Sequence, residues 1–215
     1  MGYESLQHFV RQLAKEQELV RITEPLSPYL EITEVTDRVC KRGGPALLFE
    51  NVPGYDMPVL MNAFGSMRRM CLALEVQSLE EIAAEIMTFL EAEAPDTLFK
   101  KLKLIPKLRR LANIFPKTVS RAPCQEIVLQ GDDVDLSTLP VLTCWPLDGG
   151  PFITLPVVIT HHPETGKRNA GMYRLQVYDK KTTGMHWHRH KGGAAHYRVA
   201  EQRGGAVAGG RGHWP

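Results

Sequence analysis

The sequence predicts an α+β protein, in which a mixed α/β region comes first and a β-rich region follows. Two observations predict this class. Up to Leu90, apolar residues recur at helical spacing between short apolar runs that are typical of strands. After Pro123 the pattern changes to longer β-type runs, which turn-forming segments separate.

The amino-terminal region is expected to contain three helices and three strands. Helices are predicted after the capping residue Ser5, over the segment from residue 31 to Gly43, and after Ser78, which forms a capping box with Glu81. Strands are predicted at residues 19–22, 46–49 and 59–61.

The β-rich region has four predicted strands. Turn residues at 162–166 and 180–184 separate the last three, so these three are expected to form an antiparallel meander. The predicted strands cover residues 126–130, 152–160, 169–179 and 185–190.

Composition restricts the class of protein. The chain has 215 residues, of which 43% are hydrophobic, so it can bury a core. Its net charge of +2 supplies no overall attraction to nucleic acid. The four cysteines form no Cys-x-x-Cys pair, no cleavable signal precedes them, and no apolar run reaches the roughly 20 residues that span a bilayer. A cytoplasmic protein with reduced thiols is expected.

Residues 98–123 carry eight basic residues and no acidic one. We interpret this stretch as a connector with a solvated basic face, which ends a first domain at about residue 118 and leads into a second domain at 119–203. The alternative is peripheral contact with the anionic inner face of a membrane, which would suit a substrate with a polyprenyl tail.

Three long segments resemble UbiD-family decarboxylases. They are LEITEVTDRVCKRGGPALLFENVPGYDMPVLMNAFG from Leu30, APCQEIVLQGDDVDLSTLPVLTCWPLDGGPFIT from Ala122, and RNAGMYRLQVYDKKTTGMHWHRHKGGAAHY from Arg168. The resemblance extends to about residue 203. It implies that the amino-terminal α/β domain is followed by part of a flavin-reductase-like split β-barrel.

The resemblance also implies an activity. Members of the family remove carbon dioxide, without oxidation, from aromatic or α,β-unsaturated carboxylic acids, here expected to be a 4-hydroxybenzoate-type acid in ubiquinone or menaquinone biosynthesis. They use prenylated FMN, which a flavin prenyltransferase supplies, together with Mn²⁺ and often K⁺. The modified flavin is the electron sink that decarboxylation at an sp² carbon requires. Full-length relatives are homo-oligomers.

The resemblance assigns site residues one by one. Asn169 matches the metal ligand, and its neutral amide oxygen suits a hard divalent ion. Arg174 matches the residue that organises the substrate carboxylate, a task that suits a planar guanidinium. His186 and Lys191 stand where many relatives carry Arg. The cofactor-binding positions are Met172, Tyr173, Arg174, His186, Trp187, His188, Lys191 and Gly192.

Strand geometry raises one difficulty, because alternation puts Asn169 and Arg174 on opposite faces of a regular strand. We therefore expect a β-bulge at Gly171, where glycine accepts the required backbone angles. Read without the resemblance, Asn169 is a turn residue and Arg174 a solvent-facing one. The alternating residues His186, His188 and His190 also allow a zinc site, although they lack a fourth ligand.

The Gly-rich segment 204–215 departs from the family pattern, and the acidic metal ligand and proton donor of relatives lie further along their chains. We therefore expect a truncated or frameshifted reading frame and a 215-residue chain that is inactive by itself. Two other functions stay open. One is an FMN-dependent oxidoreductase on a split barrel. The other is a non-catalytic assembly subunit.

Overall fold

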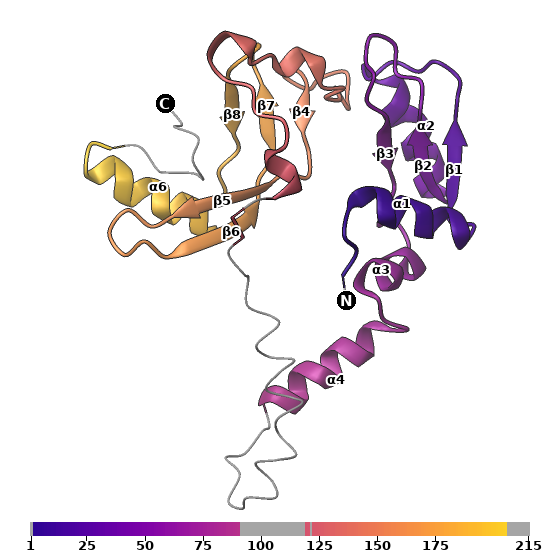
Figure 1. The fold of residues 1–215 in the computed structure, drawn as a ribbon, viewed down its shortest axis with the longest axis horizontal. Coiled ribbons are helices and arrows are strands. Elements are labelled where there is room, and N and C mark those ends of the chain that lie inside the picture. Colours follow the sequence, from indigo (N-terminus) through magenta and orange to yellow (C-terminus); the bar gives the residue numbers. More distant parts are fainter. Residues whose placement is uncertain (1, 91–118, 121, 206–215) are drawn as a thin grey trace, which may run out of the picture.

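The computed structural model describes residues 2–90, 119–120 and 122–205. Helices and strands are mixed throughout (Figure 1), so the predicted α+β class is confirmed. The strands form a three-stranded sheet in the amino-terminal half, and a second three-stranded sheet and a two-stranded hairpin in the carboxyl-terminal half. The basic connector predicted from residues 98–123 lies largely outside the described residues.

The first sheet has the order β1-β2-β3. Strand β1 (Leu19–Ile22) pairs in parallel with β2 (Ala46–Phe49), and β3 (Val59–Met61) pairs antiparallel with β2. All four residues of β2 are buried, as a strand covered on both faces requires. These three strands lie where the sequence predicts them.

Helices cover the two faces of β2. Helix α1 (Leu6–Lys15) begins after Ser5, whose hydroxyl accepts a hydrogen bond from the amide of His8 at 3.1 Å, and its Phe9 and Leu13 pack with Ala46. Helix α2 (Glu31–Lys41) connects β1 to β2 and packs Ile32 against the opposite face. Gly43 follows α2 with a φ of 65°, a conformation that favours glycine.

Two further helices lie in the described residues of this half. Helix α4 (Leu79–Leu90) starts directly after Ser78, as predicted. Helix α3 (Met67–Leu74), which begins after the capping residue Ser66, is not predicted by the sequence reading. It is held by Arg69, which is 1% exposed, forms an ion pair with Glu18 at 2.8 Å and donates to the backbone oxygen of Asn62.

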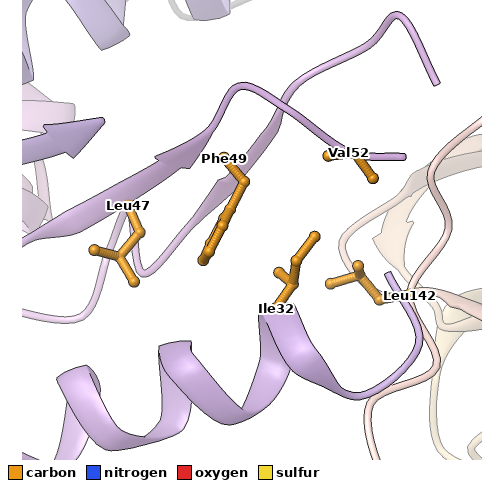
Figure 2. Packing of buried hydrophobic residues seen from close by; sticks show 5 residues of the cluster. All are labelled: Ile32, Leu47, Phe49, Val52 and Leu142. Carbon is orange, nitrogen blue, oxygen red and sulfur yellow. The ribbon is translucent and has the colours of Figure 1, made fainter. Parts of the chain in front are cut away.

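The main core cluster joins the two halves (Figure 2). Ile32, Leu47, Phe49 and Val52 converge with Leu142, which comes from the segment that precedes the second sheet. The amide of Thr143 donates to the oxygen of Pro28, and the amide of Leu30 donates to the oxygen of Thr143. Backbone bonds and apolar burial therefore dock this segment on α2.

The described residues of the second half form three 3₁₀ turns, at Pro123–Gln125, Gly131–Asp133 and Leu136–Thr138, and then five strands. Strands β4 (Phe152–Ile153), β7 (Leu175–Val177) and β8 (Thr183–Met185) form an antiparallel sheet in the order β4-β7-β8. Strands β5 (Val157–His161) and β6 (Arg168–Met172) form a hairpin, against which helix α6 (Gly192–Gln202) packs. Among the described residues this half is an open set of strands, which agrees with an incomplete barrel.

The predicted strands of this region need four corrections. Residues 126–130 form no strand, and Ile127, Val128 and Leu129 are exposed. The stretch 152–160 is two strands, separated at Pro156, which has no amide hydrogen for a ladder. The stretch 169–179 is also two strands, with a break at residues 173–174. The last strand is Thr183–Met185 and begins earlier than predicted, because the Asp179 carboxylate accepts the amides of Lys181 and Thr182 and closes the turn early.

Candidate functional site

The amino terminus of α6 lies against strand β6. Lys191 is the residue before the helix, and Gly192 and Gly193 are its first two residues. A Cβ atom added to Gly192 would stand 2.5 Å from Oδ1 of Asn169, so only glycine allows the Asn169 amide to lie this close. A helix amino terminus attracts anions, and a neutral oxygen and a lysine stand beside this one.

Tyr173 contacts both Gly193 and Lys191 at the amino terminus of α6. Its side chain is 3% exposed, and its hydroxyl accepts a hydrogen bond from the amide of Gly193 at 2.7 Å. Nζ of Lys191 donates to the backbone oxygen of Met172 at 2.9 Å and lies 5.3 Å from the centre of the Tyr173 ring. The predicted residues Met172, Tyr173, Lys191, Gly192 and Asn169 are therefore neighbours in space.

Arg174 lies just beyond the end of β6 and is exposed. Its guanidinium carbon stands 4.4 Å from the centre of the Phe152 ring, and its backbone oxygen accepts from the amide of His186 at 3.0 Å. The His186 ring meets the same Phe152 ring edge-on at 5.2 Å. Phe152 thus orients two of the predicted site residues.

Trp187 and His188 complete the predicted set. The Trp187 ring contacts the Tyr173 ring edge-on at 5.6 Å and stacks on Tyr197 of α6 at 5.4 Å. His188 is exposed, and its backbone oxygen accepts from the amide of Lys191. Residues 186–190 lie outside β8, so the alternation behind the zinc alternative does not apply to them. Within the described ranges, no group of three or more His, Cys, Asp or Glu side chains could hold a metal ion.

The bulge predicted at Gly171 is wrong. Strands β5 and β6 pair in an unbroken register, in which Val158 faces Gly171 and Thr160 faces Asn169. Gly171 has another role, because a Cβ there would stand 2.6 Å from the Tyr173 ring. Asn169 lies in β6, whereas Arg174 lies beyond its end at Met172, where the chain leaves one sheet for the other, so the alternation of a single regular strand does not relate the two residues.

Sequence reasoning missed two buried polar residues beside Asn169. Thr160 is 2% exposed and His196 is 8% exposed. Oγ1 of Thr160 and Nδ1 of His196 are 2.9 Å apart. Burial lowers the pKa of His196, and the neighbouring His162 and His161 lower it further, which favours the neutral ring. The inward position of Thr160 in an alternating strand was the one available signal.

Comparison with known proteins identifies the family. Residues 10–90 match the 3-octaprenyl-4-hydroxybenzoate carboxy-lyase N-terminal domain, and residues 117–211 match the 3-octaprenyl-4-hydroxybenzoate carboxy-lyase Rift-related domain. Together the two ranges take in most of the chain. The chain belongs to the UbiD family and corresponds to the amino-terminal part of its members.

Individual relatives and solved structures of the UbiD class also resemble this chain. An uncharacterised protein of Archaeoglobus fulgidus is 51% identical over 205 residues, which are 95% of this chain and 42% of that protein. The closed form of Sedimentibacter hydroxybenzoicus vanillic acid decarboxylase has a TM-score of 0.77 and 26% identity, covering 96% of this chain and 42% of that one. An evolved dimeric form of the UbiD-class enzyme HmfF from Pelotomaculum thermopropionicum, in complex with prFMN, has a TM-score of 0.75 and 25% identity, covering 94% and 42%.

The chain therefore spans about two fifths of the length of the relatives it matches. None of the helices in the described part of the chain has the length and apolar character needed to cross a membrane.

Proposed function

We propose that this chain supplies the cofactor-phosphate site of a prenylated-FMN-dependent carboxy-lyase that acts on aromatic or α,β-unsaturated carboxylic acids. The family description, which names 3-octaprenyl-4-hydroxybenzoate, supports a 4-hydroxybenzoate-type substrate, and a role in ubiquinone or menaquinone biosynthesis is part of the proposal. A cytoplasmic location and a flavin prenyltransferase as cofactor source belong to the same proposal. When bound, prenylated FMN supplies the electron sink for loss of carbon dioxide.

One observation carries the proposal: the oxygen of Asn169 lies over Gly192 at the amino terminus of α6, with Lys191 beside it. A phosphate fits this place, because the helix terminus and Lys191 are both positive and Gly192 leaves room for close approach. The close contact between Gly192 and the Asn169 amide, which a Cβ atom would disrupt, is the feature expected of such a site.

The residues around this place fit their proposed roles to different degrees. Asn169 supplies one neutral oxygen for Mn²⁺, so the phosphate and groups outside the described residues would complete the coordination. The Tyr173 hydroxyl accepts from Gly193 and the backbone oxygen of Met172 accepts from Lys191, which leaves the exposed Met172 side chain to contact a flavin. Arg174 is exposed and oriented by Phe152, as a residue that binds a substrate carboxylate should be.

The same proposal includes the domain boundaries. Residues 1–118 are the amino-terminal α/β domain with its basic connector, 119–203 are the partial split barrel that binds the cofactor, and 204–215 are a Gly-rich segment. Potassium at the phosphate and homo-oligomeric assembly are proposed on family grounds alone.

Flavin binding tests the first half of the proposal. The 215-residue chain is co-expressed with a flavin prenyltransferase and purified, and its flavin is identified by absorbance and mass spectrometry. Prenylated FMN or FMN is expected in the wild-type chain and is expected to be lost in Asn169→Ala and Lys191→Ala. Lys167→Ala, in the exposed turn between β5 and β6, is the matched control.

Decarboxylation tests the second half. Because the chain spans about two fifths of its relatives, the assay uses a chimera in which the remainder of the Archaeoglobus fulgidus relative follows residue 203. Carbon dioxide release is measured with 4-hydroxybenzoate and with cinnamate-type acids. A chimera that carries prenylated FMN but releases no carbon dioxide from any acid would contradict the proposed reaction.

A further inference from the structure

We infer that Thr160 and His196 are positioning residues, which orient the side-chain amide of Asn169 so that its oxygen faces the amino terminus of α6. This inference rests on the proposed function, because that function gives the Asn169 oxygen its role as a ligand. It adds two residues on β5 and α6 that lie behind the proposed site and touch no cofactor.

The side chains of Asn169, Thr160 and His196 form a chain of polar contacts from β6 through β5 to α6. Thr160 and Asn169 are directly opposite each other in the β5–β6 ladder. Nδ2 of Asn169 lies 3.5 Å from Oγ1 of Thr160 and 3.5 Å from the hydroxyl of Tyr173. Oγ1 of Thr160 lies 2.9 Å from Nδ1 of His196, which reaches it from α6. The amide nitrogen of Asn169 therefore faces two hydroxyl oxygens, and its oxygen faces Gly192.

The direction of each hydrogen bond follows from the number of hydrogens available. A threonine hydroxyl has one hydrogen to donate. When Nδ1 of neutral His196 is the unprotonated nitrogen, it takes that hydrogen, and Oγ1 of Thr160 is left as an acceptor. An acceptor at this position favours the NH₂ end of the Asn169 amide over its oxygen end. A threonine free to donate would stabilise the reversed amide equally well.

Tyr173 cannot make this choice alone. Its hydroxyl accepts from the amide of Gly193 and keeps a hydrogen of its own, so it could face either end of the Asn169 amide. With Nδ1 of His196 unprotonated, Thr160 is the group whose hydrogen is committed elsewhere. The relay from His196 through Thr160 thus determines which atom Asn169 presents at α6.

The surroundings keep His196 in place. Its ring lies in the interface between α6 and the hairpin, and the His162 ring contacts it edge-on at 5.3 Å. Thr160 and His196 are both buried, so water does not compete for their hydrogen bond. Residues that orient metal ligands in this way typically change metal affinity about 10- to 100-fold when they are replaced.

The first experiment reads the tautomer in the unmodified 215-residue chain. A two-dimensional NMR spectrum that correlates the ring carbon hydrogens of His196 with its ring nitrogens distinguishes protonated from unprotonated nitrogen. We expect unprotonated Nδ1 and protonated Nε2 in the neutral ring. A hydrogen on Nδ1 would leave Thr160 free to donate, and it overturns the inference.

The second experiment measures the dissociation constant of FMN in the presence of Mn²⁺ by quenching of flavin fluorescence. Thr160→Val, which keeps the shape and removes the hydroxyl, should weaken binding about tenfold. Thr160→Ser should restore it to within about twofold, because serine keeps the hydroxyl. His196→Phe should behave like Thr160→Val, and Thr160→Val should add nothing in the Asn169→Ala background.

The outcomes separate this inference from the proposed function. Loss of binding in Asn169→Ala, with normal binding in Thr160→Val and His196→Phe, overturns the relay and leaves the proposed site standing. Normal binding in Asn169→Ala overturns the proposed ligand. If the wild-type chain binds no FMN, the proposed function fails, and the NMR spectrum still decides the tautomer. Thermal unfolding of each variant without ligand shows that binding losses do not arise from unfolding.

Discussion

Replacing Gly192 by alanine tests the proposed phosphate site most directly. The new Cβ atom would stand 2.5 Å from Oδ1 of Asn169, whereas ordinary contact begins at 3.4 Å. The amide of Asn169 must therefore retreat by about 0.9 Å, or the start of α6 must move away from β6. Gly192 has no positive φ, so the backbone itself accepts alanine without strain.

The expected magnitudes differ for folding and for binding. Overpacking costs about 1–3 kcal/mol, and the half-buried Asn169 can yield, so about 1–2 kcal/mol is expected here. Alanine offsets up to about 1 kcal/mol of this through its better helix propensity, which leaves folding stability within about 1 kcal/mol of wild type. The gain in helix propensity does not offset the loss of FMN binding, because the displaced side chain, Asn169, is the proposed metal ligand. A cost of about 1–2 kcal/mol corresponds to roughly 5- to 30-fold weaker binding of FMN with Mn²⁺.

Fluorescence titration of FMN, together with thermal unfolding, separates the two effects. Gly205→Ala is the matched control, because its new Cβ would lie 3.9 Å from the nearest atom, the oxygen of Ala200. This control should bind like the wild type. If Gly192→Ala also binds FMN with wild-type affinity, the phosphate does not lie at the amino terminus of α6 and the reasoning is refuted.

Three further predictions follow from the geometry. In the chimera, Arg174→Ala should keep its flavin and lose about 100-fold or more in carbon dioxide release, whereas Arg168→Ala, exposed on β6, should change neither; near-normal turnover in Arg174→Ala would exclude the assigned role. Phe49→Ala should lower the free energy of unfolding by about 3–5 kcal/mol in urea titrations, because Phe49 is 0% exposed in the main core cluster, and a loss below about 1 kcal/mol would contradict that packing. Ser137 and Lys180 hold the pKa of Asp135 at about 2, below its ordinary 3.8, so its stabilising effect should be complete above pH 3.8 and disappear as pH falls through about 2; Asp135→Asn should lose that part of the pH dependence of the thermal midpoint.

The local sequence pattern was sufficient to predict a helix or strand where a single residue or run of residues determines its start, end or burial. The hydroxyl of Ser5 starts α1, Gly43 follows the end of α2, and the continuous apolar run of β2 indicates a strand buried on both faces. The family motifs likewise assign Asn169, Lys191 and Gly192 to one predicted site.

The sequence pattern was misleading where a segment of strand-forming residues has no neighbouring strand to pair with. It was also misleading where a predicted strand is divided into two shorter strands. Residues 126–130 have strand-forming side chains, but a strand also needs a neighbouring strand to pair with. Helix α3 has a local cap in Ser66, but its Arg69 also pairs with Glu18, which is 51 residues away in the sequence. No local signal contains such a contact.

The sequence by itself determined the class of fold, the family and the residue types of the proposed site, because these depend on local periodicity and on motifs of fixed spacing. Only the tertiary structure decided that β6 has no bulge at Gly171 and ends at Met172, so that Arg174 lies beyond the strand that holds Asn169. It alone brought Thr160 and His196 together behind Asn169. The physical reason is that Thr160 and His196 are 36 residues apart, so their buried hydrogen bond forms only when α6 packs against the β5–β6 hairpin. That packing involves residues along all three elements and is not contained in any local sequence pattern.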